Sequence, residues 1–351
     1  MTSRERVLTA MSRQKPDRVP RSAGFTPGVM ERFRRETGAE DPAEYWDYDD
    51  ASVGLKPPDC KTDFSPFHPE GLPEGTWMSD YGTAHKPAGF HHFFGHQYPL
   101  DQPTTLADLE AYPWPNYERD YRWEHLAADV NRLHEKGKYV SGFSGHIWET
   151  AWQVTSMPKL MLQFMAEPEQ AAYLLDRITE NNLFAARRYA EAGVDCLMTG
   201  DDVGMQDRLM MSPATWRQWF RPRWGKIWAQ AKALNPQLHI FYHSDGAIQP
   251  IIPDLIEMGL DVLNPVQPEC MDPVAIKREY GQDLAFWGCV GTQTTFPFGT
   301  PEDMRAEVKH LVETVGAGGG LYLSPTHVLE PDVPVANILA FFEACEEFGE
   351  Y

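Results

Sequence analysis

Apolar runs of strand length alternate with longer segments of helical periodicity from residue 138 onward. The helical segments repeat apolar residues every three or four positions, and they span 168–192, 213–234, 248–259, 273–280 and 301–316. The short apolar runs lie at 139–143, 196–199, 238–242, 262–264, 284–287 and 321–323. This order predicts an α/β fold with a parallel sheet and right-handed crossover helices.

Two further runs, at 19–23 and 52–55, raise the number of expected strands to eight. Eight parallel strands with alternating helices close into a (β/α)8 TIM barrel, which commonly runs to roughly 250 residues or more as one domain. We therefore expect residues 1–351 to form a single barrel domain. The dipeptides Ser212-Pro and Thr300-Pro support this segmentation, because a hydroxyl residue followed by proline is typical of a helix start.

Residues 56–122 interrupt this pattern with a segment rich in proline, aromatic residues and histidine. A long insertion in a compact domain is commonly a binding loop or a lid, and its alternating aromatic residues predict a hairpin over 76–81 and 89–98. We expect this aromatic-rich insertion to cover the barrel mouth. Its histidines His91, His92 and His96 also allow a metal site, although neighbouring loop histidines more often contact solvent or a partner subunit.

The composition narrows the classes of function. The formal net charge is −20 and Lys and Arg do not cluster, which argues against a nucleic-acid partner, because phosphate binding needs clustered cations. No apolar stretch approaches the roughly 20 residues of a membrane helix, and the N-terminus lacks an apolar signal region, so we expect a cytoplasmic protein. The 5 cysteines are scattered without a C-x-x-C pair, and we expect free thiols.

Polar side chains follow the predicted strands at the end where barrel enzymes place their active sites. His243 and Asp245 stand two residues apart at the end of the run 238–242. Side chains at i and i+2 share one face of a strand, so this pair could converge on one metal ion or one substrate group. The other strand ends contribute His146, Trp148, Glu149, Asp201, Asp202, Gln206, Asn264 and His327.

Several motifs keep a fixed order along nearly the whole chain. They are Arg4-x-Arg-Val-Leu-x-Ala-Met with Pro16-Asp-Arg-Val-Pro20, Thr199-Gly-Asp-Asp-Val-Gly-Met-Gln206, His243-Ser-Asp-Gly246 and Ser324-Pro-Thr-His-Val-Leu-Glu-Pro-Asp-Val-Pro334. In this order they resemble the motifs of the uroporphyrinogen decarboxylase superfamily. The resemblance implies a (β/α)8 barrel, in agreement with the periodicity.

The resemblance implies one of two chemistries. The decarboxylase of the heme pathway carries an arginine-rich segment that holds the propionates of a tetrapyrrole. The corresponding residues 21–26 read Arg-Ser-Ala-Gly-Phe-Thr here and keep only Arg21, so we do not expect decarboxylation of uroporphyrinogen. The chain is closer to the other branch, the zinc-dependent corrinoid methyltransferases.

Members of that branch hold zinc through His-x-Cys and a later Cys. In this chain His243, Asp245 and His327 stand at those positions and are the expected metal ligands. One carboxylate in place of two thiolates makes the site harder, which suits zinc or another divalent metal that polarises an oxygen of the substrate. The resemblance also implies a corrinoid supplied by a partner protein, and homodimers are common among such barrels.

We therefore expect a metal-dependent methyltransferase or demethylase that moves a methyl group from a methoxylated or N-methylated small molecule to a corrinoid protein. The expected catalytic residues are Glu149, Asp202 and His327, and the expected substrate-binding residues are His146, Trp148, Asp201, Gln206, Tyr81 and Asn264. Two alternatives stay open. One is a decarboxylase or lyase in which His327 and Asp202 act as acid and base on a small carboxylated substrate, and the other is a relative that binds without catalysis.

Overall fold

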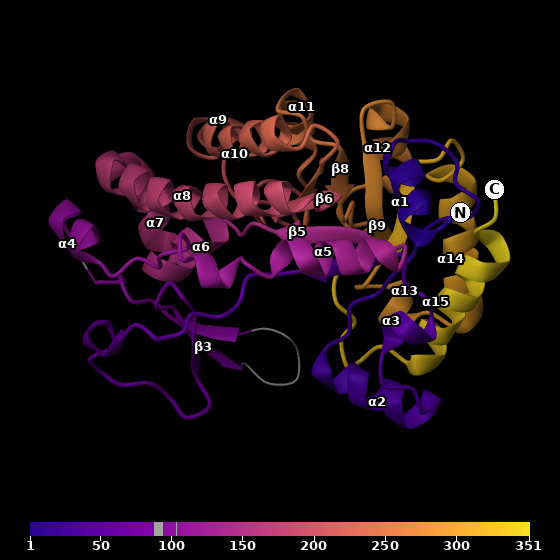
Figure 1. Cartoon of the computed structure of the whole chain (residues 1–351), viewed down its shortest axis with the longest axis horizontal. Coiled ribbons are helices and arrows are strands. Elements are labelled where there is room, and N and C mark those ends of the chain that lie inside the picture. The colour runs from indigo at the N-terminus through magenta and orange to yellow at the C-terminus, as the bar shows by residue number, and fades with distance from the viewer. Residues whose placement is uncertain (88–93, 103) are drawn as a thin grey trace.

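The computed structural model describes residues 1–87, 94–102 and 104–351. Parallel strands form a central sheet with helices packed around it, and strand β3 (Ala84–Pro87) of the aromatic-rich insertion lies below α6 (Trp148–Thr155) in Figure 1. Both chain termini lie at one end of the molecule, and α4 (Leu106–Ala111) lies at the other (Figure 1).

The centre of the described part is a sheet of seven parallel strands in the order β1-β5-β6-β7-β8-β9-β10. Each strand overlaps one of the predicted apolar runs, so the α/β architecture with a TIM-barrel-like parallel sheet is confirmed. The strands are β1 (Asp50–Val53), β5 (Tyr139–Phe143), β6 (Cys196–Gly200), β7 (His239–His243), β8 (Val262–Asn264), β9 (Ala285–Val290) and β10 (Leu321–Pro325).

The predicted strand at 19–23 does not complete the barrel, so the expected closed eight-stranded barrel is wrong for the described residues. This segment makes a single parallel bridge, between Arg21 and Leu323 of β10. Pro20 has no N–H to donate to a neighbouring strand, and the Arg21 amide donates to the Asp49 carboxylate at 3.1 Å. Pro20 and Arg21 therefore have no N–H group available for a hydrogen-bonded ladder toward β1.

Side chains bridge the open seam between the first and last strands of the sheet. The carboxylate of Asp49, directly before β1, is fully buried and accepts from Arg6 Nη1 at 2.6 Å and from Arg18 Nη1 at 2.9 Å. The Tyr322 hydroxyl of β10 donates to Asp50 Oδ1 of β1 at 2.5 Å. The sheet is thus curled into a partial barrel whose two edges meet through ion pairs and hydrogen bonds.

Two predicted helices have the expected bounds, and the others are divided or shorter than predicted. The helices predicted at 168–192 and 273–280 are confirmed, whereas the one predicted at 213–234 divides at Phe220, because Pro222 has no N–H for a continuous helix. The helices are α1 (Ser3–Met11), α2 (Pro27–Thr37), α3 (Pro42–Tyr45), α5 (Leu126–Glu135), α7 (Met157–Ala166), α8 (Pro168–Ala192), α9 (Pro213–Trp219), α10 (Arg221–Leu234), α11 (Ile252–Glu257), α12 (Pro273–Tyr280), α13 (Thr295–Phe298), α14 (Pro301–Thr314) and α15 (Val335–Phe348), with α4 and α6 above and the 3-10 turns η1 (Ser65–Phe67), η2 (Asp120–Arg122) and η3 (Gln249–Ile251).

Local signals at helix starts behave as the sequence predicts. The Ser212 hydroxyl accepts from the Thr215 amide, and Thr300 forms a capping box with Asp303. All five cysteines are free. Within the described ranges, helices lack the combination of length and apolar character that a membrane span needs.

The described part of the insertion contains three short antiparallel strands, β2 (Trp77–Met78), β3 (Ala84–Pro87) and β4 (Phe94–Gln97). The predicted hairpin missed the middle strand β3, which pairs with both of the others. The part of that hairpin at 89–93, with His91 and His92, lies outside the described residues.

Among the described residues, two backbone-directed hydrogen bonds tie the insertion to α6, the helix that follows β5. Thr83 Oγ1 donates to the Gln153 carbonyl at 2.6 Å, and the Leu100 amide donates to the Val154 carbonyl at 3.0 Å. These bonds hold the small sheet next to the carboxyl end of β5, where the candidate site begins.

Candidate active site

Titratable side chains gather at the carboxyl ends of β5, β6 and β7, the edge at which barrel enzymes carry their active sites. One cluster consists of Asp202, His243 and Asp245, and a second consists of His146, Glu149 and Asp201. Within each cluster the potential ligand atoms lie within 4.8 Å of one another. The strand register explains their meeting, because Gly200 at the end of β6 is paired with His243 at the end of β7.

The first cluster is built around the His243 ring. Asn264, at the end of β8, donates its Nδ2 to the Trp287 carbonyl at 2.6 Å, so its Oδ1 faces His243 Nδ1 at 2.5 Å. A carbonyl only accepts, which fixes the orientation of the amide and makes His243 Nδ1 the donor to Asn264. The remaining nitrogen, Nε2, lies 3.5 Å from Asp202 Oδ1.

Asp202 also binds the loop that carries Asp245. Asp202 Oδ1 accepts from the Asp245 amide at 2.8 Å. Burial alone would lower the pKa of His243, but the carboxylates of Asp202 and Asp245 outweigh it and raise the pKa above its ordinary value. A positive charge at this point is therefore favoured, whether a proton on His243 or a bound cation supplies it.

This arrangement fits a divalent cation. In neutral His243 the lone pair on Nε2 points toward an oxygen that also carries lone pairs, and a cation between them would satisfy both. Two carboxylates and one imidazole form a donor set that zinc and several other divalent metals accept. The bond from His243 Nδ1 to Asn264 is the kind of outer contact that orients a ligating histidine.

Two of the predicted ligands, His243 and Asp245, lie together in the structure, and His327 stays a predicted ligand. Asp202 joins His243 and Asp245, whereas the ring centre of His327 lies 6.3 Å from that of His243. His327 follows β10, and its ring plane is tilted by 54° to that of His243. The adjacent acidic residues at 201–202 indicated a site residue in the sequence. They did not indicate which of the two carboxylates approaches His243.

The second cluster is an ion pair joined to the first cluster. His146 Nδ1 lies 2.9 Å from Glu149 Oε2 and 2.6 Å from the Gly200 carbonyl, so it donates to both acceptors. Glu149 Oε2 in turn accepts from the Asp202 amide at 3.2 Å. Burial disfavours both charges, yet their mutual attraction raises the pKa of His146 to about 9 and lowers the pKa of Glu149.

Asp201, the third member of this cluster, holds the start of α6. Its Oδ1 accepts from the amides of Ile147 and Glu149 at 2.9 and 3.2 Å, and its Oδ2 accepts from Trp224 Nε1 at 3.0 Å. Burial raises the pKa of Asp201 to about 7, and the bonds from Glu149 and Trp224 oppose that shift. Asp201 is fully buried, so its neighbours are protein groups and its contacts are structural.

The remaining predicted residues lie in different surroundings. Trp148 is fully buried against Phe164 and Phe220. Gln206 is exposed and donates to the Glu269 carbonyl and Gln293 Oε1. Buried Tyr81 accepts a hydrogen bond from Asn181 Nδ2 at 3.1 Å.

A cavity of about 360 Å³ lies between the insertion and the carboxyl end of β5, and both Tyr81 and His146 line it. Trp77 and His85 contribute to its wall from the insertion, and Phe143 contributes from β5. His85 is not among the site residues predicted from the sequence. Its only signal was a place in the aromatic-rich insertion.

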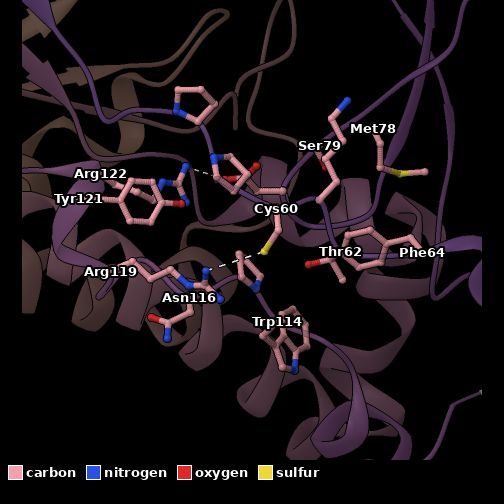
Figure 2. Close-up of a pocket in the computed structure, with 15 residues that line it drawn as sticks. Cys60, Thr62, Phe64, Met78, Ser79, Trp114, Asn116, Arg119, Tyr121 and Arg122 are labelled. Carbon is pink, nitrogen blue, oxygen red and sulfur yellow. Dashed lines mark hydrogen bonds and ion pairs between the residues drawn. The ribbon is translucent and has the colours of Figure 1, made fainter.

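Figure 2 shows a second cavity, formed within the insertion, in which Arg119 and Cys60 face each other. The two cavities share the residues 78–80 in their walls. Strand ends of the central sheet contribute no residue to this second cavity, so the first cavity is the one next to the titratable clusters.

The family model described as uroporphyrinogen decarboxylase (URO-D) matches residues 98–348. The chain belongs to the URO-D family. Relatives of this URO-D family member include the uroporphyrinogen decarboxylase of Pseudoalteromonas translucida (strain TAC 125), which is 23% identical over 304 residues and covers 83% of each chain. The enzyme of the same name from Pseudomonas syringae pv. tomato is 23% identical over 263 residues, with 70% of each chain covered.

Among solved structures, a methyltransferase from Methanosarcina mazei matches this URO-D family chain with a TM-score of 0.69 and 21% sequence identity. The match covers 99% of both chains, so the two proteins share the whole fold.

Arg21 marks a departure of this URO-D family chain from the arginine-rich pattern of the decarboxylase. Its guanidinium is buried and binds Glu346 of α15 at 2.8 Å. The one arginine that remains of that segment is therefore engaged in an ion pair within the protein.

Proposed function

We propose that this URO-D family protein is a metal-dependent methyltransferase that takes a methyl group from a methoxylated or N-methylated small molecule and passes it to a corrinoid protein. The observation that carries the proposal is the cluster of Asp202, His243 and Asp245 at the strand ends. The match of the whole fold to the methyltransferase from Methanosarcina mazei supports it.

Asp202, His243 and Asp245 would hold the metal, with His327 beside them. When bound, a divalent metal supplies a Lewis acid that makes an ether oxygen a better leaving group. Asn264 keeps His243 in the tautomer that presents Nε2, because it accepts the proton on Nδ1. The protein thus provides the ligand orientation before any metal arrives.

The departing oxygen needs a proton to become a hydroxyl group. His146 holds a proton at neutral pH because its pKa is raised to about 9, and Glu149 binds it at 2.9 Å. Glu149 also contacts the Asp202 amide, so the pair stands next to the metal cluster. We assign proton supply to His146 and Glu149.

Metal analysis tests the proposal directly. Native protein should carry about one equivalent of zinc or another divalent metal, and His243→Ala should lose it, because one of a few ligands is removed. His310→Ala, which changes an exposed histidine on α14, is the matched control and should keep the metal. Equal metal content in native protein and His243→Ala would contradict the site.

Activity gives the second test of the same proposal. Metal-loaded protein with a cobalt(I) corrinoid partner should demethylate at least one methoxylated or N-methylated compound, measured by the absorbance change of the corrinoid. Failure with every such donor would contradict methyl transfer even if the metal binds.

A decarboxylase or lyase is the second candidate, favoured by the curated relatives named uroporphyrinogen decarboxylase and by the 3.5 Å approach of His243 to Asp202. Such a pair can act as acid and base without a metal. Full activity of metal-stripped protein on a small carboxylated substrate, with carbon dioxide release as the measurement, would favour this candidate over the first.

A further inference from the structure

The cavity between the insertion and β5 contains a buried imidazole that lacks hydrogen bonds to any of the described residues. His85, on the middle strand β3, is 5% exposed and lines the cavity. Neither of its ring nitrogens has a hydrogen-bond partner in the part of the chain that the structure describes. Buried polar groups in native proteins are nearly always paired, so a ligand in this cavity would supply the partner that the described residues do not.

The His85 ring is held in place by aromatic neighbours. It stacks on Trp77 with ring centres 4.1 Å apart and planes 10° apart, and the ring centre of His96 lies 4.9 Å away in an edge-to-face arrangement. Burial, with a smaller effect of His96, lowers the pKa of His85 to about 4. The ring is therefore neutral at physiological pH, with one N–H to donate and one lone pair to accept.

The charges that line the cavity are already compensated. Asp80 binds Arg122 Nη2 at 2.9 Å, and His146 binds Glu149. A ligand with a net charge would find no counter-ion among the described lining residues. The cavity therefore selects a neutral molecule.

The aromatic walls and the size of the cavity favour a planar ring. Trp77 on the insertion side and Phe143 on the barrel side both line it and are 48% and 44% exposed. Exposed aromatic faces gain contact area when a flat ring packs on them. A volume of about 360 Å³ falls in the usual range for small-molecule sites.

We propose that this cavity binds a phenol, with the ring against the aromatic walls and the hydroxyl group hydrogen-bonded to His85. This inference rests on the proposed function, because it names methoxylated phenols as the class of methyl donor. A phenolic hydroxyl both donates and accepts, so it can pair with whichever nitrogen of His85 faces it. A quaternary N-methylated cation offers no hydrogen bond at its charged end and would leave His85 unpaired.

The cavity is also connected to the reaction centre proposed above. His146 lines the cavity and binds Glu149, and Glu149 contacts Asp202 of the metal cluster. A phenol held in this cavity therefore lies one ion pair away from the residues that would hold the metal.

Isothermal titration of the purified full chain with 2-methoxyphenol tests the inference. His85→Phe keeps the stacking on Trp77 but removes both nitrogens, and it should weaken binding at least about tenfold, as expected for a lost buried hydrogen bond. Methoxybenzene, which lacks the hydroxyl group, should bind native protein and His85→Phe equally. Equal affinity of 2-methoxyphenol for both proteins would overturn the proposal.

Phe143→Ala gives an independent test from the barrel side, because this side chain is 44% exposed and lines the cavity. It should also weaken 2-methoxyphenol binding about tenfold. Phe298→Ala, which truncates an aromatic residue that is 80% exposed on α13, should leave binding unchanged. Binding of trimethylglycine in place of 2-methoxyphenol would overturn the choice of ligand.

The outcomes separate this inference from the proposed function. Binding of 2-methoxyphenol that depends on His85 but leads to no methyl transfer would contradict the proposed function and leave the phenol site intact. Demethylation of 2-methoxyphenol with a KM that His85→Phe does not change would contradict the phenol site and leave the proposed function intact.

Discussion

At the scale of single residues, the hydrogen-bond partners of His243 and His146, which lie near neighbouring strand ends, favour different roles for the two rings. His243 donates a hydrogen bond from Nδ1 to Asn264 and presents Nε2 to Asp202. This is how a histidine that binds a metal ion is usually oriented. His146 donates from Nδ1 to Glu149 and stays charged, which is the arrangement of a proton donor. The role of each ring depends on the acceptor of its Nδ1 hydrogen bond, which is a neutral amide for His243 and a carboxylate for His146.

The charge of His146 should make stability depend on pH. The folded pKa of about 9 lies above the ordinary value of 6.5, so the stabilisation is complete below about pH 6.5 and is lost as the pH rises through about 9. His146→Gln keeps a donor for Glu149 and the Gly200 carbonyl but removes the charge. Native protein should exceed it in free energy of unfolding by about 2 kcal/mol near pH 6, and by much less near pH 10.

Urea denaturation over this pH range measures the difference, and His310→Gln on exposed α14 is the control. A gap between native protein and His146→Gln that stays constant from about pH 6 to about pH 10 would mean that the hydrogen bonds matter and the charge does not.

At the scale of elements, the start of α6 is set by a residue from the next strand. Asp201, just after β6, accepts from the amides of Ile147 and Glu149, which open the helix, and from the Trp224 indole of α10. One carboxylate therefore fixes α6 relative to β6 and α10. Because α6 also anchors the insertion through Gln153 and Val154, the position of the insertion depends on the same contact.

Asp201→Ala should lower the free energy of unfolding by about 3 kcal/mol, because it leaves three buried N–H donors without an acceptor. Chemical denaturation monitored by tryptophan fluorescence measures this change. Asp207→Ala, at an exposed loop position, should change stability by less than about 0.5 kcal/mol. Similar small losses for both variants would show that Asp201 does not anchor the helix.

At the scale of the whole molecule, charged side chains stabilise the seam between β1 and β10, where a closed barrel would have a further strand. Asp49 is fully buried and binds Arg6 and Arg18, which come from α1 and from the segment before 19–23. The seam therefore joins the N-terminal segment to the first strand, while Tyr322 joins the last strand to it. Stability of the partial barrel depends on these ion pairs more than on a closing ladder.

Asp49→Asn should destabilise the protein by about 3–5 kcal/mol, because it leaves the guanidinium groups of Arg6 and Arg18 beside a neutral amide in a buried site. The neighbouring variant Asp47→Asn removes an exposed ion pair to Lys138 and should cost less than about 1 kcal/mol. Thermal and urea unfolding of the two variants give the comparison. If Asp49→Asn is no less stable than Asp47→Asn, the seam is held by packing alone.

Local order along the chain was readable from residue types. The apolar runs located every strand of the central sheet, the caps at Ser212 and Thr300 began helices as expected, and the spacing of His243 and Asp245 placed both near one point. These features depend on bonds and periods between near neighbours, so the sequence carries them in full.

Relations between distant segments depended on packing in three dimensions. The approach of Asp202 to His243, the distance of His327 from it and the open seam at Asp49 depend on strand register and on how far the central sheet curls. The middle strand β3 with His85 depends on pairing within the separate sheet of the insertion. A shift of a few ångströms between strand ends exchanges one carboxylate or imidazole for another, and no local pattern encodes a distance of that size. The chain alone thus predicted that a site exists at the strand ends, and the folded arrangement selected the side chains that meet there.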